Sequence, residues 1–138
     1  MPRNTPVKQR ATNRFSRQAR LLSSDDFQKV FKQTNYRSVD QRLTVLARQN
    51  GLDHARLGLA ISKRIIKTAV GRNRVKRQVR ESFRQHQRSL TGLDIVVLSR
   101  NAAPQASNPE LVSSLQIHWQ RVTKQLVKQL KKQQCAKA

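Results

Sequence analysis

The sequence predicts an α+β fold, a two-layer sandwich in which helices pack on a small mixed sheet in the order α-β-β-β-α-β-α. Hydrophobic residues alternate with a period of two between residues 36 and 61, and a continuous apolar run follows at 93–99. The segments around these strands have helical periodicity, and a helical segment between two strands suggests a crossover unit. The 138 residues suffice for one domain with a core and tails.

The two ends of the chain differ in composition from its middle. Residues 1–13 contain prolines and cations with almost no apolar side chains, which predicts a flexible basic arm. Residues 14–130 are predicted to form the single folded domain. Residues 131–138, rich in Lys and Gln, are predicted to be a solvated basic tail.

A first helix is predicted from about residue 24 to 33. Ser23 or Ser24 can cap its free backbone N–H groups, and Asp25 and Asp26 favour the positive end of the helix dipole. The apolar residues of this helix share one face: Phe27, Val30 and Phe31.

Two or three strands joined by turns are predicted from Tyr36 to Ile61. Asn50-Gly51 is a strong turn signal between them. Gly58 and Ala60 alternate with larger side chains, so one face of the sheet should be shallow there. That shallow face leaves room either for a ligand or for a closely packed helix.

The segment 71–88 combines a narrow apolar stripe with a broad cationic face. Val75, Val79 and Phe83 lie within about 80° on a helical wheel, so this edge can pack on a core. Residues 63–88 contain ten Lys or Arg and one acid, Glu81. Surfaces that serve only solubility intersperse both signs of charge, so we interpret this face as a polyanion-binding surface rather than a merely solvated one.

The remaining elements complete the sandwich. The run at 93–99 is predicted to be a buried central strand. A last helix should begin with Asn108 as cap, followed by Pro109 and Glu110. One stripe of this helix closes the core: Leu111, Leu115, Trp119, Val122, Leu126 and Leu130.

The charge balance favours a nucleic-acid partner. The chain has 29 Lys and Arg against 7 Asp and Glu, a net charge of +22. The basic helix lacks the wide apolar face of a membrane-surface helix, and no segment resembles a signal peptide or a membrane span, which predicts a cytoplasmic protein with no membrane partner. Cys135 is single and the three His are isolated, so no protein-built metal site is expected.

No catalytic residues are expected in this chain. Only seven acids exist, and Asp25 with Asp26 are explained as first-turn carboxylates, so the acid cluster of a two-metal nuclease is missing. The sequence likewise offers no support for a Ser, His and Asp relay, and none for a small-molecule substrate.

Two segments carry distinctive motifs. Residues 56–64 read Arg-Leu-Gly-Leu-Ala-Ile-Ser-Lys-Arg, and residues 71–84 carry Arg-Asn-Arg at 72–74 with Val-Lys-Arg and Arg-Glu-Ser-Phe-Arg in register. Together these segments closely resemble the protein subunits of bacterial ribonuclease P. The likeness covers roughly residues 14–130, including 25–31 and 94–97.

The resemblance implies a ribosomal-protein-like domain with a left-handed crossover between parallel strands, where handedness rules alone favour the right-handed form. It also implies that a catalytic RNA subunit removes the 5′ leader of precursor tRNA with Mg²⁺ held mainly by the RNA subunit and the substrate. The partners would then be ribonuclease P RNA and precursor tRNA. A structural ribosomal RNA-binding protein is the alternative, because composition alone does not separate the two.

The sequence and the resemblance together nominate two sets of residues. The predicted RNA-binding set is Lys63, Arg64, Arg72, Asn73, Arg74, Lys76, Arg77, Arg80 and Arg84. The predicted leader-binding set is Phe15, Phe27 and Phe31, of which Phe27 and Phe31 could equally be core residues. The chain departs from some members in having Leu46 where they carry an aromatic residue, a place that Tyr36 could partly fill.

Overall fold

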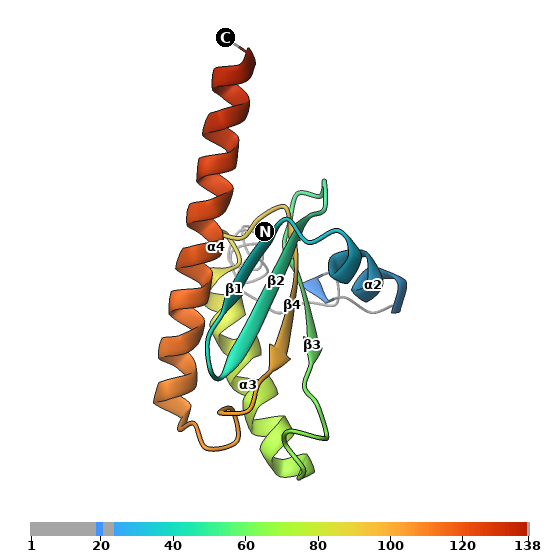
Figure 1. Ribbon diagram of the computed structural model, residues 1–138, viewed down its shortest axis with the longest axis vertical. Helices are drawn as coiled ribbons and strands as arrows, with labels where there is room; N and C mark the ends of the chain where they lie inside the picture. Colours follow the sequence, from blue (N-terminus) through green and yellow to red (C-terminus); the bar gives the residue numbers. More distant parts are fainter. Residues whose placement is uncertain (1–18, 21–23, 138) are drawn as a thin grey trace, which may run out of the picture.

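The structure, a computed structural model, describes residues 19–20 and 24–137, with side chains described up to residue 132 (Figure 1). Its elements are α2 (Ser24–Lys32), β1 (Tyr36–Val39), β2 (Leu43–Gln49), β3 (Arg56–Ala60), α3 (Ala69–His86), β4 (Leu93–Ser99) and α4 (Asn108–Lys137). This order confirms the predicted α-β-β-β-α-β-α succession. Phe15 and the arm at 1–13 lie outside the described residues.

The four strands form one mixed sheet in the order β1-β2-β4-β3. β1 pairs with β2 and β2 pairs with β4 in antiparallel fashion, whereas β3 pairs with β4 in parallel. Because α3 connects the parallel neighbours β3 and β4, the predicted crossover unit is confirmed. β4 is one of the two inner strands, and nearly all of its residues are buried, as the apolar run predicts.

The centre of the sheet is buried on both faces. On one face, α3 and α4 pack on a large cluster that includes Ile95 and Val97 of β4. On the other, Val30 of α2 packs with Leu46 and Val96 in a smaller cluster (Figure 1). The sheet therefore separates a side covered by α3 and α4 from a side covered by the short α2.

The apolar stripe of α3 is buried as predicted, and it orients the whole helix. Val75, Val79 and Phe83 have no exposed surface. The ring of Phe83 meets Trp119 of α4 edge to face, with centroids 6.3 Å apart, and the Trp119 indole donates a hydrogen bond to Ser82 Oγ at 2.8 Å. Trp119 is thus a core residue, as predicted, and it fixes α3 against α4.

Helix α3 begins at a tightly packed turn. Thr68 Oγ1 accepts a hydrogen bond from the Gly71 N–H at 3.0 Å and so caps the helix. A Cβ atom at Gly71 would lie 2.9 Å from both Ile66 Cγ2 and Thr68 Oγ1. The position therefore requires glycine for the close approach of this turn.

Helix α4 differs from the prediction at both ends. Its cap is Ser107 rather than Asn108: Ser107 Oγ accepts from the Glu110 N–H at 3.2 Å, and Glu110 Oε1 accepts from the Ser107 N–H at 2.8 Å. The helix also continues to Lys137 instead of fading near residue 130, and its last turns extend past the sheet (Figure 1). Lys, Gln and Ala are good helix formers and add helical turns without a core to pack on.

Asp94 anchors the end of the sheet near the Asn50-Gly51 turn, where Gly51 has the positive φ of 70° that the turn signal predicts. Asp94 is 1% exposed and accepts two hydrogen bonds from Arg56, at 2.7 and 2.6 Å. Asn50 Nδ2 donates to the same carboxylate at 2.9 Å. This buried charge is satisfied only while these partners stay in place.

Replacing Asp94 with Ala should therefore lower the free energy of unfolding by about 3 kcal/mol, because Arg56 and Asn50 lose their buried partner. Urea denaturation monitored by circular dichroism measures this. The matched control is Asp53→Ala in the neighbouring turn, whose carboxylate is almost fully exposed and should change stability little. Equal effects of the two substitutions would contradict a special role for Asp94.

Candidate nucleic-acid interface

The outer side of α3 and the loop before it carry cations with no internal partner. The side chains of Lys63, Arg64, Arg77 and Arg80 are exposed, and that of Lys76 is half-buried. These five side chains form no hydrogen bond or ion pair with the described part of the chain. Because Val75, Val79 and Phe83 are buried on the other side of the helix, Arg77 and Arg80 face away from the core.

Arg72 has an internal contact that sequence reasoning missed. Its guanidinium donates to the carbonyl oxygens of Ile66 and Lys67, at 2.9 and 3.1 Å. It thereby braces the loop that carries Lys63 and Arg64 against the first turn of α3.

Arg74 also makes internal contacts, to a different element. It donates to Asn108 Oδ1 at 2.8 Å and to the Pro104 carbonyl at 3.5 Å. These bonds tie α3 to the loop and first turn of α4, while Asn73 between the two arginines is exposed. A guanidinium has five N–H donors, so Arg72 and Arg74 keep some free for a phosphate.

Arg84 is paired with Glu81, one turn earlier on the same helix. The hydrogen bond from Arg84 lowers the pKa of Glu81, which keeps this carboxylate ionised at neutral pH. Glu81 is the one acid in the basic segment, and it partly neutralises Arg84, so this arginine is less available than Arg77 and Arg80.

The predicted aromatic set divides between surface and core. Phe31 is 45% exposed, whereas Phe27 is half-buried against the cluster of Val30, Leu46 and Val96. The core interpretation therefore holds partly for Phe27 and fails for Phe31. Leu46 of β2 lies beneath α2 and forms part of this cluster.

The suggestion that Tyr36 fills the place of the missing aromatic residue is wrong. Tyr36 is 6% exposed and belongs to the large cluster on the α3 and α4 side of the sheet. It pairs across β1 and β2 with Ala47, whereas Leu46 points to the opposite face. Strand alternation places the two side chains on opposite sides.

The shallow face at Gly58 and Ala60 lies toward α2. Gly58 is buried, and Ala60 is half-buried against the same small cluster as Phe27. α2 contacts β2 and β4, and Asp26 of α2 reaches Arg56 of β3 with an ion pair of 3.6 Å. The α2 side thus has Phe27 and Ala60 packed against one cluster, with Phe31 exposed on the same helix.

The structure brings together a Ser, a His and an Asp that lie far apart in the sequence and were not expected to meet. Ser38 Oγ lies 2.6 Å from His118 Nδ1, and Asp40 Oδ2 lies 3.1 Å from His118 Nε2 without good hydrogen-bond alignment. Ser38 is 3% exposed and His118 fully buried, so the group has no access for a substrate. It fastens the β1–β2 turn to α4. The position of His118 within the apolar stripe of α4 indicates that this side chain is buried, but not which groups it contacts.

Burial governs the protonation of this group. Desolvation lowers the pKa of His118. The negative charge of Asp40 raises this pKa in part, and the positive charge of the nearby Arg121 lowers it further. Burial alone would raise the pKa of Asp40. Hydrogen bonds from Ser114 and from the Leu43 and Arg42 amides have the larger effect, so the pKa of Asp40 is lowered. His118 is therefore neutral and Asp40 ionised at neutral pH.

Other kinds of site are limited by what the described residues contain. Among the side chains described, those of residues 19–20 and 24–132, no three from His, Cys, Asp or Glu converge as metal ligands do. No helix within these ranges has both the length and the apolar character to span a bilayer.

Comparisons with known proteins agree with the resemblance seen in the sequence. A family model described as Ribonuclease P matches residues 15–123. A ribonuclease P protein component of Vibrio cholerae is 48% identical over 114 residues, covering 83% of this chain and 96% of the relative. One of Aliivibrio fischeri is 48% identical over 110 residues, covering 80% and 93%.

Solved structures give the same result for the fold. The Staphylococcus aureus RNase P protein is 30% identical, with a TM-score of 0.69 over 76% of this chain and 97% of that one. The RNase P protein of Thermotoga maritima is 30% identical, with a TM-score of 0.67 over 75% and 96%.

The lowered pKa of His118 predicts a loss of stability on acidification. The unfolded chain takes up a proton on this His near pH 6.5, whereas the folded chain does so only at lower pH, so the free energy of unfolding should fall as pH drops below 6.5. Urea titrations at pH 7.5, 6.5 and 5.5 measure the slope. The His118→Gln variant should be less stable at neutral pH, but its free energy of unfolding should change less over this pH range. His86→Gln serves as the control. A slope unchanged in His118→Gln would contradict this assignment.

Proposed function

Because the chain belongs to the family of bacterial ribonuclease P protein components, we propose that its α3 surface binds the catalytic RNA subunit and its α2 side binds the 5′ leader of precursor tRNA. The family makes the chain an auxiliary subunit of an endoribonuclease that processes tRNA. In this proposal the protein works in the cytoplasm and contributes binding, and the RNA performs the cut.

The observation that carries the proposal is the unpartnered cationic surface of α3. Arg77 and Arg80 project from a helix whose other edge is fully buried, so their Cα positions are fixed before any RNA arrives. Fork-shaped guanidiniums match phosphate oxygens, and a preorganised scaffold reduces the entropy lost on binding. Lys63, Arg64 and Lys76 extend the same surface along the loop and the helix flank.

Arg72 and Arg74 have a double role in this proposal. Their internal bonds hold the loop before α3 and the start of α4 in place, and their remaining donors can bind phosphate. Asn73, exposed between them, adds one donor and one acceptor for an RNA edge.

The leader is assigned to the α2 side because single-stranded RNA needs stacking surfaces as well as charge. Phe31 supplies an exposed ring, and Phe27 supplies a partly exposed one beside it. Phe15 joins this set on the resemblance alone.

Mg²⁺ is assigned to the RNA subunit and the substrate, where it supplies charge stabilisation for phosphodiester hydrolysis. Six of the seven acids are engaged elsewhere. Asp94 and Asp26 pair with Arg56, Asp53 with His54 and Glu81 with Arg84, while Asp40 holds the β1–β2 turn and Glu110 caps α4. The carboxylates of the described residues are thus poorly placed to bind Mg²⁺, which supports ligands from the RNA subunit and the substrate.

Reconstitution tests the division of labour. Purified protein with Mg²⁺ should cleave no leader, whereas protein with ribonuclease P RNA should cleave precursor tRNA at lower salt and Mg²⁺ than the RNA alone. Robust turnover by the protein without RNA would overturn the proposal.

The double substitution Arg77→Gln with Arg80→Gln should lower the slope of log affinity against log salt by about 1.5 units for ribonuclease P RNA, since each phosphate contact contributes about 0.7–0.9. Thermal stability should stay unchanged because neither side chain has a described partner. Lys29→Gln with Lys32→Gln, on α2, removes equal charge as a control.

Arg74→Ala provides a contrast to that pair. It should weaken RNA binding and also lower the free energy of unfolding by about 1 kcal/mol, through loss of the bonds to Asn108 and Pro104. Filter binding over a salt series and thermal melting measure the two effects. An unchanged salt slope in the Arg77 and Arg80 variant would count against α3 as the RNA-binding surface.

Phe31→Ala should weaken binding of the holoenzyme to leader-bearing precursor by about 1–3 kcal/mol, the value of one stacked base, and leave mature tRNA binding unchanged. Leu52→Ala, a similarly exposed apolar residue in the turn after β2, is the control. Equal losses for precursor and mature tRNA would argue against a leader site at α2.

A further inference from the structure

A second cationic surface lies on α4, separate from the cations of α3 and of the loop before it. Its members are exposed and belong to the last third of the sequence: Arg121, Lys124, Lys128, Lys131 and Lys132. Beyond Glu110 the sequence of this helix contains no acid. The α4 surface, as we call these five residues, therefore has uncompensated positive charge.

The five cations share one side of the helix. At about 100° per residue they fall within an arc of about 100°, and they extend about 16 Å along the axis. The buried residues Leu115, Trp119 and Val122 lie on the other side. The spacing therefore makes a continuous stripe rather than charges scattered around the helix.

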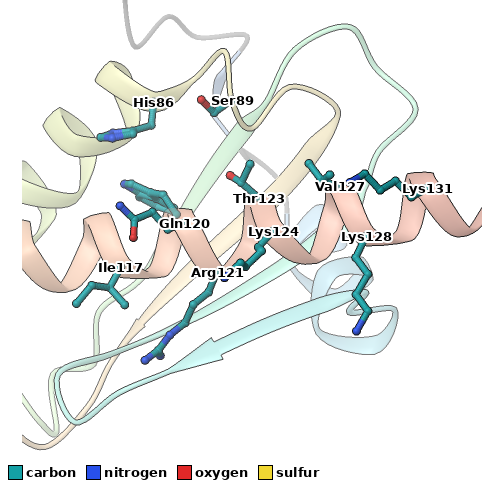
Figure 2. Close-up of a pocket in the computed structure, with 11 residues that line it drawn as sticks. His86, Ser89, Ile117, Gln120, Arg121, Thr123, Lys124, Val127, Lys128 and Lys131 are labelled. Atoms are coloured by element: carbon teal, nitrogen blue, oxygen red, sulfur yellow. The ribbon is translucent and has the colours of Figure 1, made fainter.

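The stripe borders an open groove of about 850 Å³ (Figure 2). Arg121, Lys124, Lys128 and Lys131 line it together with His86 and Ser89, which lie at and just beyond the C-terminal end of α3. The lining also includes the apolar side chains of Ile117 and Val127, both 45% exposed. No carboxylate from the described residues lines it.

We propose that the α4 surface and this groove bind the phosphate backbone of the ribonuclease P RNA subunit, as a contact additional to that of α3. This inference rests on the proposed function. Charge complementarity selects a polyanion, and the isolated positions of Ile117 and Val127 among cations suit ribose and base surfaces better than a lipid bilayer, which requires a continuous apolar face.

The position of the groove selects the RNA subunit over the substrate leader. α3 and α4 cover the same face of the sheet, and the end of α3 lines the groove. Phe31 and Phe27, assigned to the leader, lie on α2 and on the opposite face. One structured RNA bound along α3 can therefore continue onto α4.

The test compares two triple variants of the full chain with equal charge loss. Lys124→Gln, Lys128→Gln and Lys131→Gln neutralise the α4 surface, and Arg121 is kept because it donates to Ser38 Oγ and the Val39 carbonyl. The control is Lys29→Gln, Lys32→Gln and Arg37→Gln, three exposed cations on α2 and β1.

Each variant is titrated with ribonuclease P RNA alone, and separately with precursor tRNA alone, between 50 and 200 mM salt. For ribonuclease P RNA, the slope of log affinity against log salt should be smaller in magnitude by about 2 units in the α4 variant. When the salt is raised fourfold, wild type should therefore lose about 16-fold more affinity than the variant does. For this RNA the control variant should keep the wild-type slope. With precursor tRNA, the α4 variant should keep the wild-type slope.

The possible results distinguish three failures: of the α4 contact, of the choice of RNA partner, and of the proposed function. Equal slope losses in both variants would mean that net charge alone matters and would overturn the α4 contact. A loss confined to precursor tRNA would overturn the choice of partner. If wild type bound ribonuclease P RNA no better than an unrelated structured RNA, the proposed function itself would fail.

A second measurement uses the unmodified protein and is independent of variant folding. Bound ribonuclease P RNA should slow acetylation of Lys124, Lys128 and Lys131, read by mass spectrometry, at least as much as that of Lys76, and should leave Lys29 and Lys32 reactive. Undiminished acetylation of the α4 lysines in the saturated complex would contradict the proposal.

Discussion

The packing of the α3 stripe against α4 is the interaction on which the rest of this molecule depends. Val75, Val79 and Phe83 are fully buried, and Trp119 meets Phe83 edge to face while its indole bonds to Ser82. This contact fixes the rotation of α3 about its own axis. The Cα positions of the cations on the other side of the helix are therefore fixed, and their side chains project outward.

That arrangement concentrates like charges, and the structure limits the resulting repulsion through local partners. Arg84 pairs with Glu81, and Arg72 and Arg74 place part of their charge against backbone carbonyls and Asn108. Arginine suits both tasks because its planar fork has more donors than one partner can use. Binding a phosphate and bracing the loop are compatible functions of one side chain.

The two faces of the sheet separate the two proposed tasks. α3 and α4 form a broad basic layer on one face, suited to a large folded RNA, while α2 places Phe31 and Phe27 on the other, suited to a single strand. β4 lies between them and contributes buried side chains to both clusters, so the faces are mechanically linked through one strand.

Local periodicity in the sequence determined the helices, the strands and the side of α3 that is buried, because each depends on neighbours a few residues apart. The cationic surface followed for the same reason. The tertiary structure alone decided which distant polar groups meet: Arg74 with Asn108, and His118 with Ser38, 80 residues away. It also placed Tyr36 and Leu46 on opposite faces, since strand pairing, not composition, sets where a side chain points. Such contacts arise from packing between elements, and a single sequence carries no periodic signal for them.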